Sequence, residues 1–174
     1  MRAVNMTLNT KFNIRIDLSV LNLILPDVKY NKHNFNAAVH KDLRTKTTCL
    51  IFESGSVTII GSTSRSKARK TLKRLMKTLK VFYPDIENSK LVVRNRVWTK
   101  VLSPSFNLLK SYKNATDSVA FTYINYEPEL FSGLILKQNK LTAMIFRSGK
   151  CIITGGSKKR EMSKFFDLFV KVLE

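Results

Sequence analysis

The chain contains two copies of one segment, and this repeat limits the possible folds more than any other feature of the sequence. Residues 48–61 return as residues 142–155, with Phe52 and Phe146 separated by 94 positions. Each copy has two short apolar runs rich in β-branched residues, joined by a Ser-Gly pair, which is typical of a tight hairpin. We therefore expect two related halves, because a repeated unit sets the architecture of the whole chain.

An amphipathic helical pattern follows each hairpin. In the first copy apolar residues recur at helical spacing from Ala68 to Leu79, and basic residues fill the other faces. In the second copy the pattern extends from Met162 to Leu173, and Ser157 is predicted to cap it. Each helix needs a sheet against which to bury its apolar side.

Shorter helices are predicted upstream of both hairpins. Asp17 is placed to cap one that ends before Pro26, and Ser103-Pro104 is placed to start its counterpart in the second copy. Together with the hairpins, these helices predict an α+β fold with an antiparallel sheet.

The boundaries of the repeats follow from the spacing. Tyr30 and Tyr126 match at a separation of 96, so two residues are predicted to be missing from the second copy between Leu134 and Leu141. The polar stretch 83–90 is a connector. The predicted organisation is a first repeat over residues 1–82, a connector over 83–90 and a second repeat over 91–174.

The hairpin strands are apolar on both faces. In the first copy Cys49 and Ile51 alternate with Leu50 and Phe52, and the second copy has the same pattern. A sheet covered by helices on one side normally places polar residues on the other. Protein layers on both faces would explain the pattern, but only two substantial helices are available. The alternative is an exposed apolar platform that a partner covers.

The charge indicates what that partner is. Lysine and arginine number 31 against 12 acidic residues, which gives a formal net charge of +19. Such a chain repels itself unless an anionic partner is present, either nucleic acid or a membrane surface. No apolar run is long enough for a transmembrane span, and the N-terminus lacks an apolar signal segment. We expect an intracellular, soluble protein that binds nucleic acid.

An enzyme is not expected. The histidines His33 and His40 lie in one segment without a paired nucleophile, and no Gly-rich phosphate loop is present. Cys49 and Cys151 are predicted to be reduced, packed thiols, with oxidation or reactivity as the alternative. No cofactor or metal ligand set is predicted.

One segment resembles a known family closely. Residues 126–135, Tyr-Glu-Pro-Glu-Leu-Phe-Ser-Gly-Leu-Ile, are similar to a signature of the TATA-binding protein family with one change, at Ser132. Tyr30-Asn31, Phe35, residues 47–52 and the two Ser-Gly turns also resemble that family. The resemblance implies a saddle of two pseudo-symmetric repeats, with a concave DNA-binding sheet under convex helices. It also implies a transcription initiation factor that binds and bends AT-rich promoter DNA through the minor groove.

The resemblance further implies roles for individual residues. The DNA-intercalating pairs are Phe35 with Phe52 and Phe131 with Phe146, for which ordinary core aromatics are the alternative. The minor-groove residues are Asn5, Thr7, Leu50, Thr58, Ile60, Asn95, Val97, Met144, Ile152 and Thr154; for the asparagines the alternative is a structural strand-end role. The phosphate contacts are Lys41, Lys137, Ser54, Ser148 and Lys150. The contacts to transcription factor IIB are Glu127, Glu129 and Leu130.

Several positions depart from the family pattern. Threonine replaces groove-facing valines at Thr7 and Thr58, and Ile60 replaces the threonine that would pair with Thr154. Asn34 and Ser56 stand where the family has basic residues. These departures indicate two unequal halves and an altered sequence preference.

The expected partners are double-stranded promoter DNA, a transcription factor IIB-like protein and the RNA polymerase machinery, with no membrane and a monomer on DNA. The expected location is the nucleus, or a cytoplasmic transcription site if the protein is viral. Three other interpretations remain at this stage. One is a protein adaptor of the same fold with weak or altered DNA specificity, another is a single-stranded RNA binder, and the third is a saddle-like domain that accompanies a nucleic-acid hydrolase.

Overall fold

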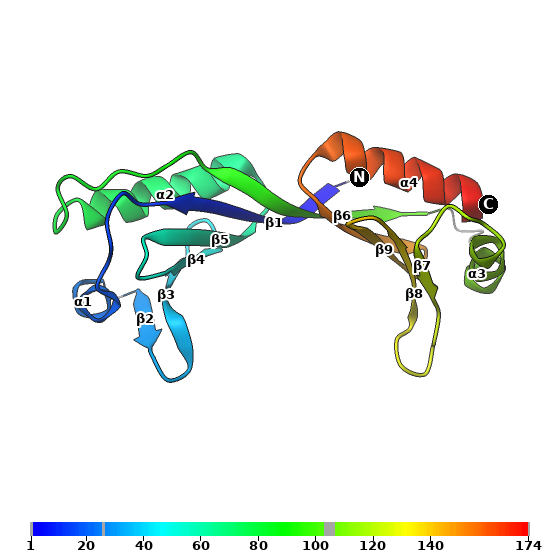
Figure 1. Cartoon of the computed structure of the whole chain (residues 1–174), viewed down its shortest axis with the longest axis horizontal. Coiled ribbons are helices and arrows are strands. Elements are labelled where there is room, and N and C mark those ends of the chain that lie inside the picture. Colours follow the sequence, from blue (N-terminus) through cyan, green and yellow to red (C-terminus); the bar gives the residue numbers. More distant parts are fainter. Residues whose placement is uncertain (1, 26, 103–106, 174) are drawn as a thin grey trace. The chain divides into compact units, whose positions relative to one another are not determined.

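The chain folds as two compact units in a computed structural model that describes residues 2–25, 27–102 and 107–173. The first unit comprises residues 5–94, and the second unit comprises residues 95–174 together with 1–4. Each unit is built from antiparallel strands and helices (Figure 1).

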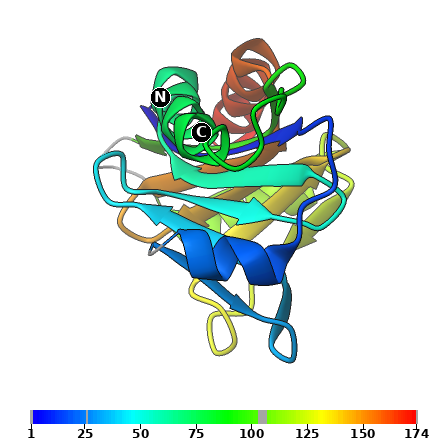
Figure 2. The same ribbon diagram turned by 90° about the vertical axis from the view of Figure 1, so that its left-hand side faces the viewer.

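The first unit presents five strands and two helices among the described residues. They are β1 (Arg2–Lys11), α1 (Leu18–Ile24), β2 (Val28–Asn31), β3 (Phe35–Asp42), β4 (Thr47–Ile51), β5 (Ser56–Ser62) and α2 (Arg65–Leu79). The strand order is β2-β3-β4-β5-β1. Helix α2 packs on β4 and β5, and α1 packs on β2 and β3. Figure 2 shows α2 on one side of these strands, with the turn between β2 and β3 extending away from it.

The second unit repeats this arrangement. Its elements are β6 (Val92–Val101), α3 (Leu108–Thr116), β7 (Tyr123–Asn125), β8 (Gly133–Gln138), β9 (Leu141–Phe146), β10 (Lys150–Gly156) and α4 (Lys159–Leu173). The strand order β6-β10-β9-β8-β7 mirrors that of the first unit. The predicted α+β class, with two related units, antiparallel strands and two long helices, is confirmed.

Helix ends in the first unit follow the sequence signals. The carboxylate of Asp17 accepts hydrogen bonds from the backbone N–H groups of Ser19 and Val20, as predicted for the cap of α1. Ser64 caps α2 by accepting from the N–H of Lys67. These side chains satisfy backbone donors that have no partner inside the helix.

Of the two helix starts predicted for the second unit, one lies outside the described residues and the other is wrong. The predicted start at Ser103-Pro104 lies outside the described residues, and α3 as described begins after Asn107, whose side chain accepts from the N–H of Lys110 at 3.1 Å. The prediction that Ser157 caps α4 is wrong, because the helix begins at Lys159 and Lys158 precedes it directly. The first carbonyl of the helical ladder is that of Lys158, which accepts from Met162.

The predicted two-residue deletion is confirmed at one turn. Strands β3 and β4 are joined by residues 43–46, whereas β8 and β9 are joined by residues 139–140 alone. The strands on either side keep their correspondence, so the deletion shortens a turn and leaves the sheet register of the unit unchanged.

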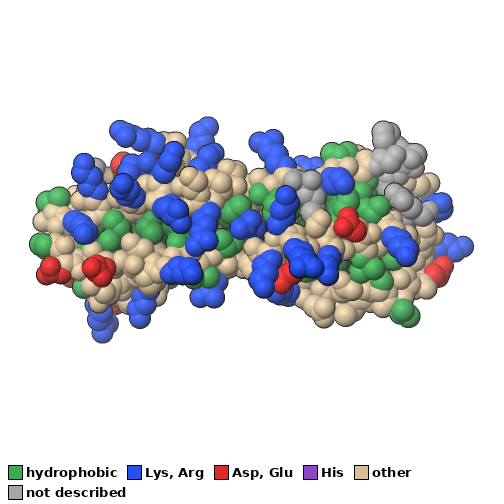
Figure 3. Space-filling model, turned by 90° about the horizontal axis from the view of Figure 1, so that it is seen from above, with side chains coloured by type: hydrophobic (Ala, Val, Ile, Leu, Met, Phe, Trp, Pro, Cys, Tyr) green, Lys and Arg blue, Asp and Glu red, His purple; other side chains and the backbone are tan. Residues whose placement is uncertain are grey.

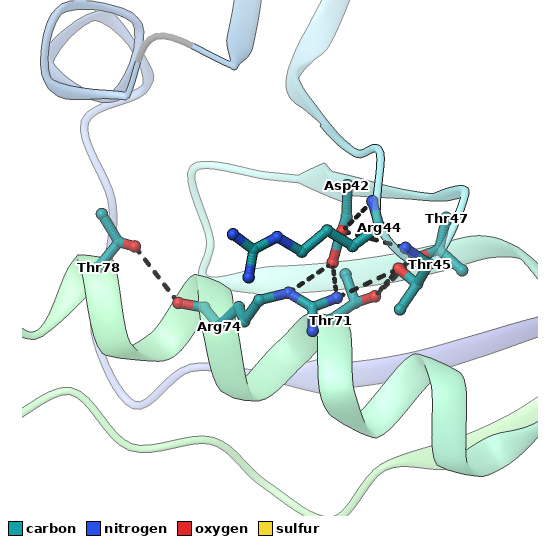
Figure 4. Close-up of polar contacts among 7 residues, drawn as sticks. All are labelled: Asp42, Arg44, Thr45, Thr47, Thr71, Arg74 and Thr78. Carbon is teal, nitrogen blue, oxygen red and sulfur yellow. Dashed lines mark hydrogen bonds and ion pairs between the residues drawn. The ribbon is translucent and has the colours of Figure 1, made fainter.

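The longer turn of the first unit is held by a polar cluster (Figure 4). The Asp42 carboxylate accepts from the N–H groups of Arg44 and Thr45 in the turn and from the guanidinium of Arg74 in α2. The hydroxyls of Thr45 and Thr71 lie 2.5 Å apart. The cluster therefore ties the β3–β4 turn directly to the long helix.

The second unit uses apolar contacts at the equivalent positions. Helices α2 and α4 correspond at a separation of 94, so Phe165 and Leu168 stand where the first unit has Thr71 and Arg74. Phe165 is buried and packs edge-on against Phe169 at 5.6 Å between ring centroids. The two repeats therefore differ at these positions, and the β8–β9 turn is joined to α4 by an ion pair between Lys140 and Glu161 at 3.5 Å.

None of the helices formed by the described residues has the length and hydropathy needed to cross a membrane.

Candidate nucleic-acid interface

The strands of each unit have a face turned away from the long helix, which we call the open face. In β4 the side chains of Cys49 and Ile51 are fully buried beneath α2, whereas Leu50 and Phe52 are half-buried on the open face. The second unit alternates in the same way, with Ile145 buried and Met144 half-buried. The second apolar side expected from the sequence is therefore present and is incompletely covered by protein.

All ten predicted minor-groove residues lie on the open faces. In the first unit Asn5, Thr7, Leu50, Thr58 and Ile60 are half-buried.

The second unit matches them position for position. The half-buried residues there are Asn95, Val97, Met144, Ile152 and Thr154.

Strand register brings these side chains into rows. Leu50 lies opposite Thr58, which in turn lies opposite Asn9 across β4, β5 and β1. In the second unit Met144 lies opposite Ile152 across β9 and β10. Directly opposed residues share one face of an antiparallel sheet, so each row crosses the open face of its unit.

The four predicted intercalating phenylalanines form two pairs, each with one exposed and one half-buried ring. Phe35 and Phe52 meet edge to face with ring centroids 6.3 Å apart, and Phe131 and Phe146 do so at 5.7 Å. Phe35 is 47% exposed and Phe131 is 38% exposed. Burying such a ring is worth about 1.5–3 kcal/mol, so leaving two of them open is costly unless a partner covers them. Phe35 and Phe131 are therefore not core aromatics, whereas Phe52 and Phe146 are half-buried.

Gly133 leaves the space that the rings of Phe131 and Phe146 occupy. A Cβ at this position would lie 2.7 Å from Cε1 of Phe131 and 3.1 Å from Cε1 of Phe146. The first unit has Ala37 at the equivalent position, and its two rings stand farther apart. Sequence reasoning did not identify this role, although the Phe-x-Gly spacing before β8 was available as a signal.

The two asparagines make the same hydrogen bond in both units. Oδ1 of Asn5 accepts from the N–H of Gly61 at 3.0 Å, and Oδ1 of Asn95 accepts from the N–H of Gly155 at 3.0 Å. Both glycines have positive φ, +80° and +93°, where β5 and β10 change register against their neighbours. Such a bulge exposes a backbone donor, and the asparagine oxygen satisfies it. Both asparagines lie within strands rather than at strand ends.

The remaining amide donors differ between the units. Nδ2 of Asn95 donates to Oγ1 of Thr154 at 3.1 Å. Ile60 occupies the equivalent place in the first unit and has no acceptor, so Nδ2 of Asn5 has no hydrogen bond within the described part of the chain. A free amide donor is suited to the base acceptors of the minor groove.

The predicted phosphate contacts are exposed around the open faces. Lys41, Lys137 and Lys150 are exposed on β3, β8 and β10, and Ser54 and Ser148 are exposed in the two hairpin turns. Nζ of Lys137 lies 4.6 Å from the centroid of the Tyr123 ring, a cation–π contact.

The predicted protein-contact residues lie in the segment between β7 and β8. Glu127, Glu129 and Leu130 are all exposed, and Leu130 is 82% exposed. The Glu127 carbonyl accepts from the N–H groups of Leu130 and Phe131, which holds the segment in a turn. An exposed leucine preceded by two exposed carboxylates is a small amphipathic patch.

Titratable groups give little support for catalytic chemistry. Burial raises the pKa of both the Cys49 and the Cys151 thiol to about 12, so neither is a thiolate at neutral pH. Burial likewise lowers the pKa of His40. The described residues contain no group of three His, Cys, Asp or Glu side chains that could hold a metal ion.

Positive charge is not confined to the open faces. Figure 3 shows Lys and Arg side chains over the helix-bearing face of both units. Helix α2 contains no acidic residue, and its basic side chains at Lys67, Arg69, Lys70 and Lys73 are exposed. Positive charge alone therefore does not single out one face of either unit.

Comparison with known proteins gives a consistent result. The family model described as "Transcription factor TFIID (or TATA-binding protein, TBP)" matches residues 1–82 and 90–174. The "TATA-box-binding protein" of Methanocaldococcus jannaschii is 34% identical over 182 residues, covering 99% of this chain and 95% of that protein. That of Candida albicans is 27% identical and covers 97% of this chain and 70% of its own. The solved "Methanococcus jannaschii TBP" matches with a TM-score of 0.83 at 27% identity, covering 99% of this chain and 97% of that one.

Proposed function

Because this chain belongs to the TATA-binding protein family, we propose that it binds and bends AT-rich promoter DNA through the minor groove, with both open faces in contact with the duplex. Family membership makes it a transcription factor of the TATA-box-binding type. DNA bending and the contacts with partner proteins are what we propose beyond family membership.

The observation that carries the proposal is the presence of two phenylalanine pairs at equivalent positions, each with one exposed ring. Minor-groove proteins insert apolar side chains between base steps and so bend the duplex, a mode of which the TATA-binding protein is itself a known example. Phe35 and Phe131 are the more exposed members of their pairs. Phe52, directly after β4, and Phe146, at the end of β9, support them. Pyrimidine–purine steps such as TA unstack most readily, which favours AT-rich sites.

The open faces supply the rest of the interface. The half-buried apolar side chains Leu50, Met144 and Ile152 give a surface that can lie against base edges, and Asn5 supplies a free amide donor. Exposed lysines around the open faces are placed to neutralise phosphates.

Bending is measured by energy transfer between dyes at the two ends of a short duplex. We expect the protein to shorten the end-to-end distance of an AT-rich duplex with TA steps, and to leave a GC-rich duplex straight. A Phe131→Ala/Phe146→Ala variant should lose bending because the wedge is gone. Phe82→Ala is the matched control, since Phe82 is 47% exposed outside the open faces.

Equal binding of both duplexes without bending would contradict the proposal. It would leave a nonspecific electrostatic interaction and favour a protein adaptor of the same fold.

We also propose that the segment with Glu127, Glu129 and Leu130 contacts a transcription factor IIB-like protein, with one copy of this chain on each site. The support is the exposed Leu130 directly after two exposed carboxylates, Glu127 and Glu129. A Leu130→Ala/Glu127→Lys variant should still shift an AT-rich duplex in a native gel but fail to form the larger complex with a transcription factor IIB-like protein. An undiminished larger complex would refute this assignment.

A further inference from the structure

The two open faces differ at two equivalent positions. Thr7 in β1 corresponds to Val97 in β6, and Thr58 in β5 corresponds to Ile152 in β10. All four side chains are half-buried on the open faces of their units. The first unit therefore presents hydroxyl groups where the second unit presents only hydrocarbon.

These two hydroxyls have no partner among the residues that the structure describes. Neither Thr7 nor Thr58 makes a side-chain hydrogen bond to any residue that the structure describes. By contrast, the hydroxyl of Thr154 in the second unit is already bonded to Nδ2 of Asn95. A hydroxyl can donate one hydrogen bond and accept two, so Thr7 and Thr58 keep this capacity for a ligand.

The difference between hydroxyl and hydrocarbon groups matters for the base pairs that each unit can contact in the minor groove. A·T and T·A pairs present only acceptors there, while a G·C pair adds the N2 amine of guanine, which is a donor. A threonine hydroxyl can accept a hydrogen bond from that amine. A valine or isoleucine side chain cannot, so it would remove the amine from water and leave it unpaired, which is unfavourable.

We propose that the two units read their halves of the site differently: the first unit tolerates a G·C pair through the hydroxyls of Thr7 and Thr58, and the second unit, with Val97 and Ile152, restricts its half to A·T pairs. This inference rests on the proposed minor-groove binding.

A palindromic duplex of alternating T and A tests the inference whichever way round the protein binds. One derivative carries a single G·C pair in one half, and another carries the same change in both halves. The protein can turn round on a palindrome and place its tolerant unit on the single substitution. We expect the single change to weaken binding by less than about 3-fold and the double change to weaken it by about 10-fold or more.

Inosine isolates the amine from other effects. An I·C pair is a G·C pair without the N2 amine, so duplexes with inosine in place of guanine should bind like the parent. Dissociation constants are compared between guanine and inosine duplexes for each protein separately, which removes differences in overall affinity or folding between variants.

Reciprocal variants identify the residues. Thr7→Val/Thr58→Val removes the hydroxyls with little change in volume, and the single guanine should then cost about 10-fold relative to inosine. Val97→Thr/Ile152→Thr should make the doubly substituted duplex bind within about 3-fold of its inosine counterpart.

Two results would overturn the inference and have different meanings. In the first result, the second guanine weakens binding only as much as the first, and Thr7→Val/Thr58→Val leaves both guanine-to-inosine ratios of dissociation constants unchanged. The hydroxyls then do not contact the amine, although minor-groove binding is unaffected. If the wild-type protein neither prefers nor bends the unsubstituted AT duplex, the proposed function fails and this inference fails with it.

Discussion

Gly155 occupies a backbone position that other residues cannot adopt without strain. Its φ is +93°, and an added Cβ would overlap the carbonyl oxygen of Lys140. Gly61, at the equivalent place, has φ +80°, but a Cβ there would lie 3.2 Å from the carbonyl oxygen of Lys46. Both glycines also donate to the paired asparagines, so a shift of either bulge would move a side chain of the open face.

We expect Gly155→Ala to lower the free energy of unfolding by about 2–3 kcal/mol, the sum of backbone strain and the steric overlap. Gly61→Ala should cost about 1 kcal/mol, because strain is then the main contribution. Urea denaturation of both variants beside the wild type measures the difference. Equal costs for the two substitutions would show that the overlap at Lys140 relaxes freely.

At the residue scale, repeated spacing in the sequence predicts the face on which a side chain lies, but it does not predict contacts between distant strands. The four phenylalanines and both asparagines lie on the open faces, as the resemblance implied. The space at Gly133 and the bond from Asn95 to Thr154 did not emerge, because each depends on which side chains meet across a strand pair. Periodicity in a single sequence predicts on which face of the sheet a side chain lies. It does not predict which side chain of the adjacent strand that residue contacts.

At the scale of elements, the polar cluster of the first unit links stability to pH. Burial alone would raise the pKa of the Asp42 carboxyl, but hydrogen bonds from Arg74, Thr45 and Thr71 outweigh it and lower the pKa from 3.8 to about 2. A depressed carboxyl pKa stabilises the folded state at every pH above the unfolded value, and this contribution is lost as pH falls from about 4 to about 2.

Asp42→Asn should therefore destabilise the first unit, and the pH-dependent part of that loss is about 2 kcal/mol at neutral pH. The difference between wild type and variant should shrink as the pH is lowered through 4 towards 2, because the wild-type carboxyl becomes protonated. Urea midpoints measured at several pH values test this. Glu87→Gln, a change at an exposed carboxylate in the connector, is the control. A constant difference across this range would contradict the assigned cause.

The elements themselves were largely predictable. Both long helices, the Asp17 cap and the shortened β8–β9 turn agree with the expectations from periodicity and repeat spacing. The preference of serine for the cap position predicts a cap at Ser157. However, β10 continues to Gly156 and the helix begins at Lys159, one residue later than a Ser157 cap requires. Tertiary pairing of β10 outweighs the local preference of one side chain.

At the scale of the whole molecule, the net charge of +19 and the partly exposed aromatic pairs have separate consequences. Positive charge raises the affinity for any duplex by neutralising phosphates, and this contribution depends on salt concentration. Insertion of the phenylalanines and contacts from the open faces depend on the base steps at the site. Basic residues lie on both the strands and the helix-bearing face, so only some of them can contact DNA bound to the open faces (Figure 3).

Lys41 and Lys137 are predicted to be among those that do. A protein that neutralises phosphates releases counterions, so the slope of log affinity against log salt should decrease in magnitude by about 0.9 for each lost contact. We expect Lys41→Ala/Lys137→Ala to reduce the slope by nearly twice that amount on AT-rich and GC-rich duplexes alike, leaving the ratio between them unchanged. Lys70→Ala, on the exposed side of α2, should leave the slope as it is, because that helix packs on the opposite face of the strands. If Lys70→Ala reduced the slope as much as each strand lysine does, DNA would also contact the helix-bearing face, and the assignment of the open faces as the DNA-binding surface would be wrong.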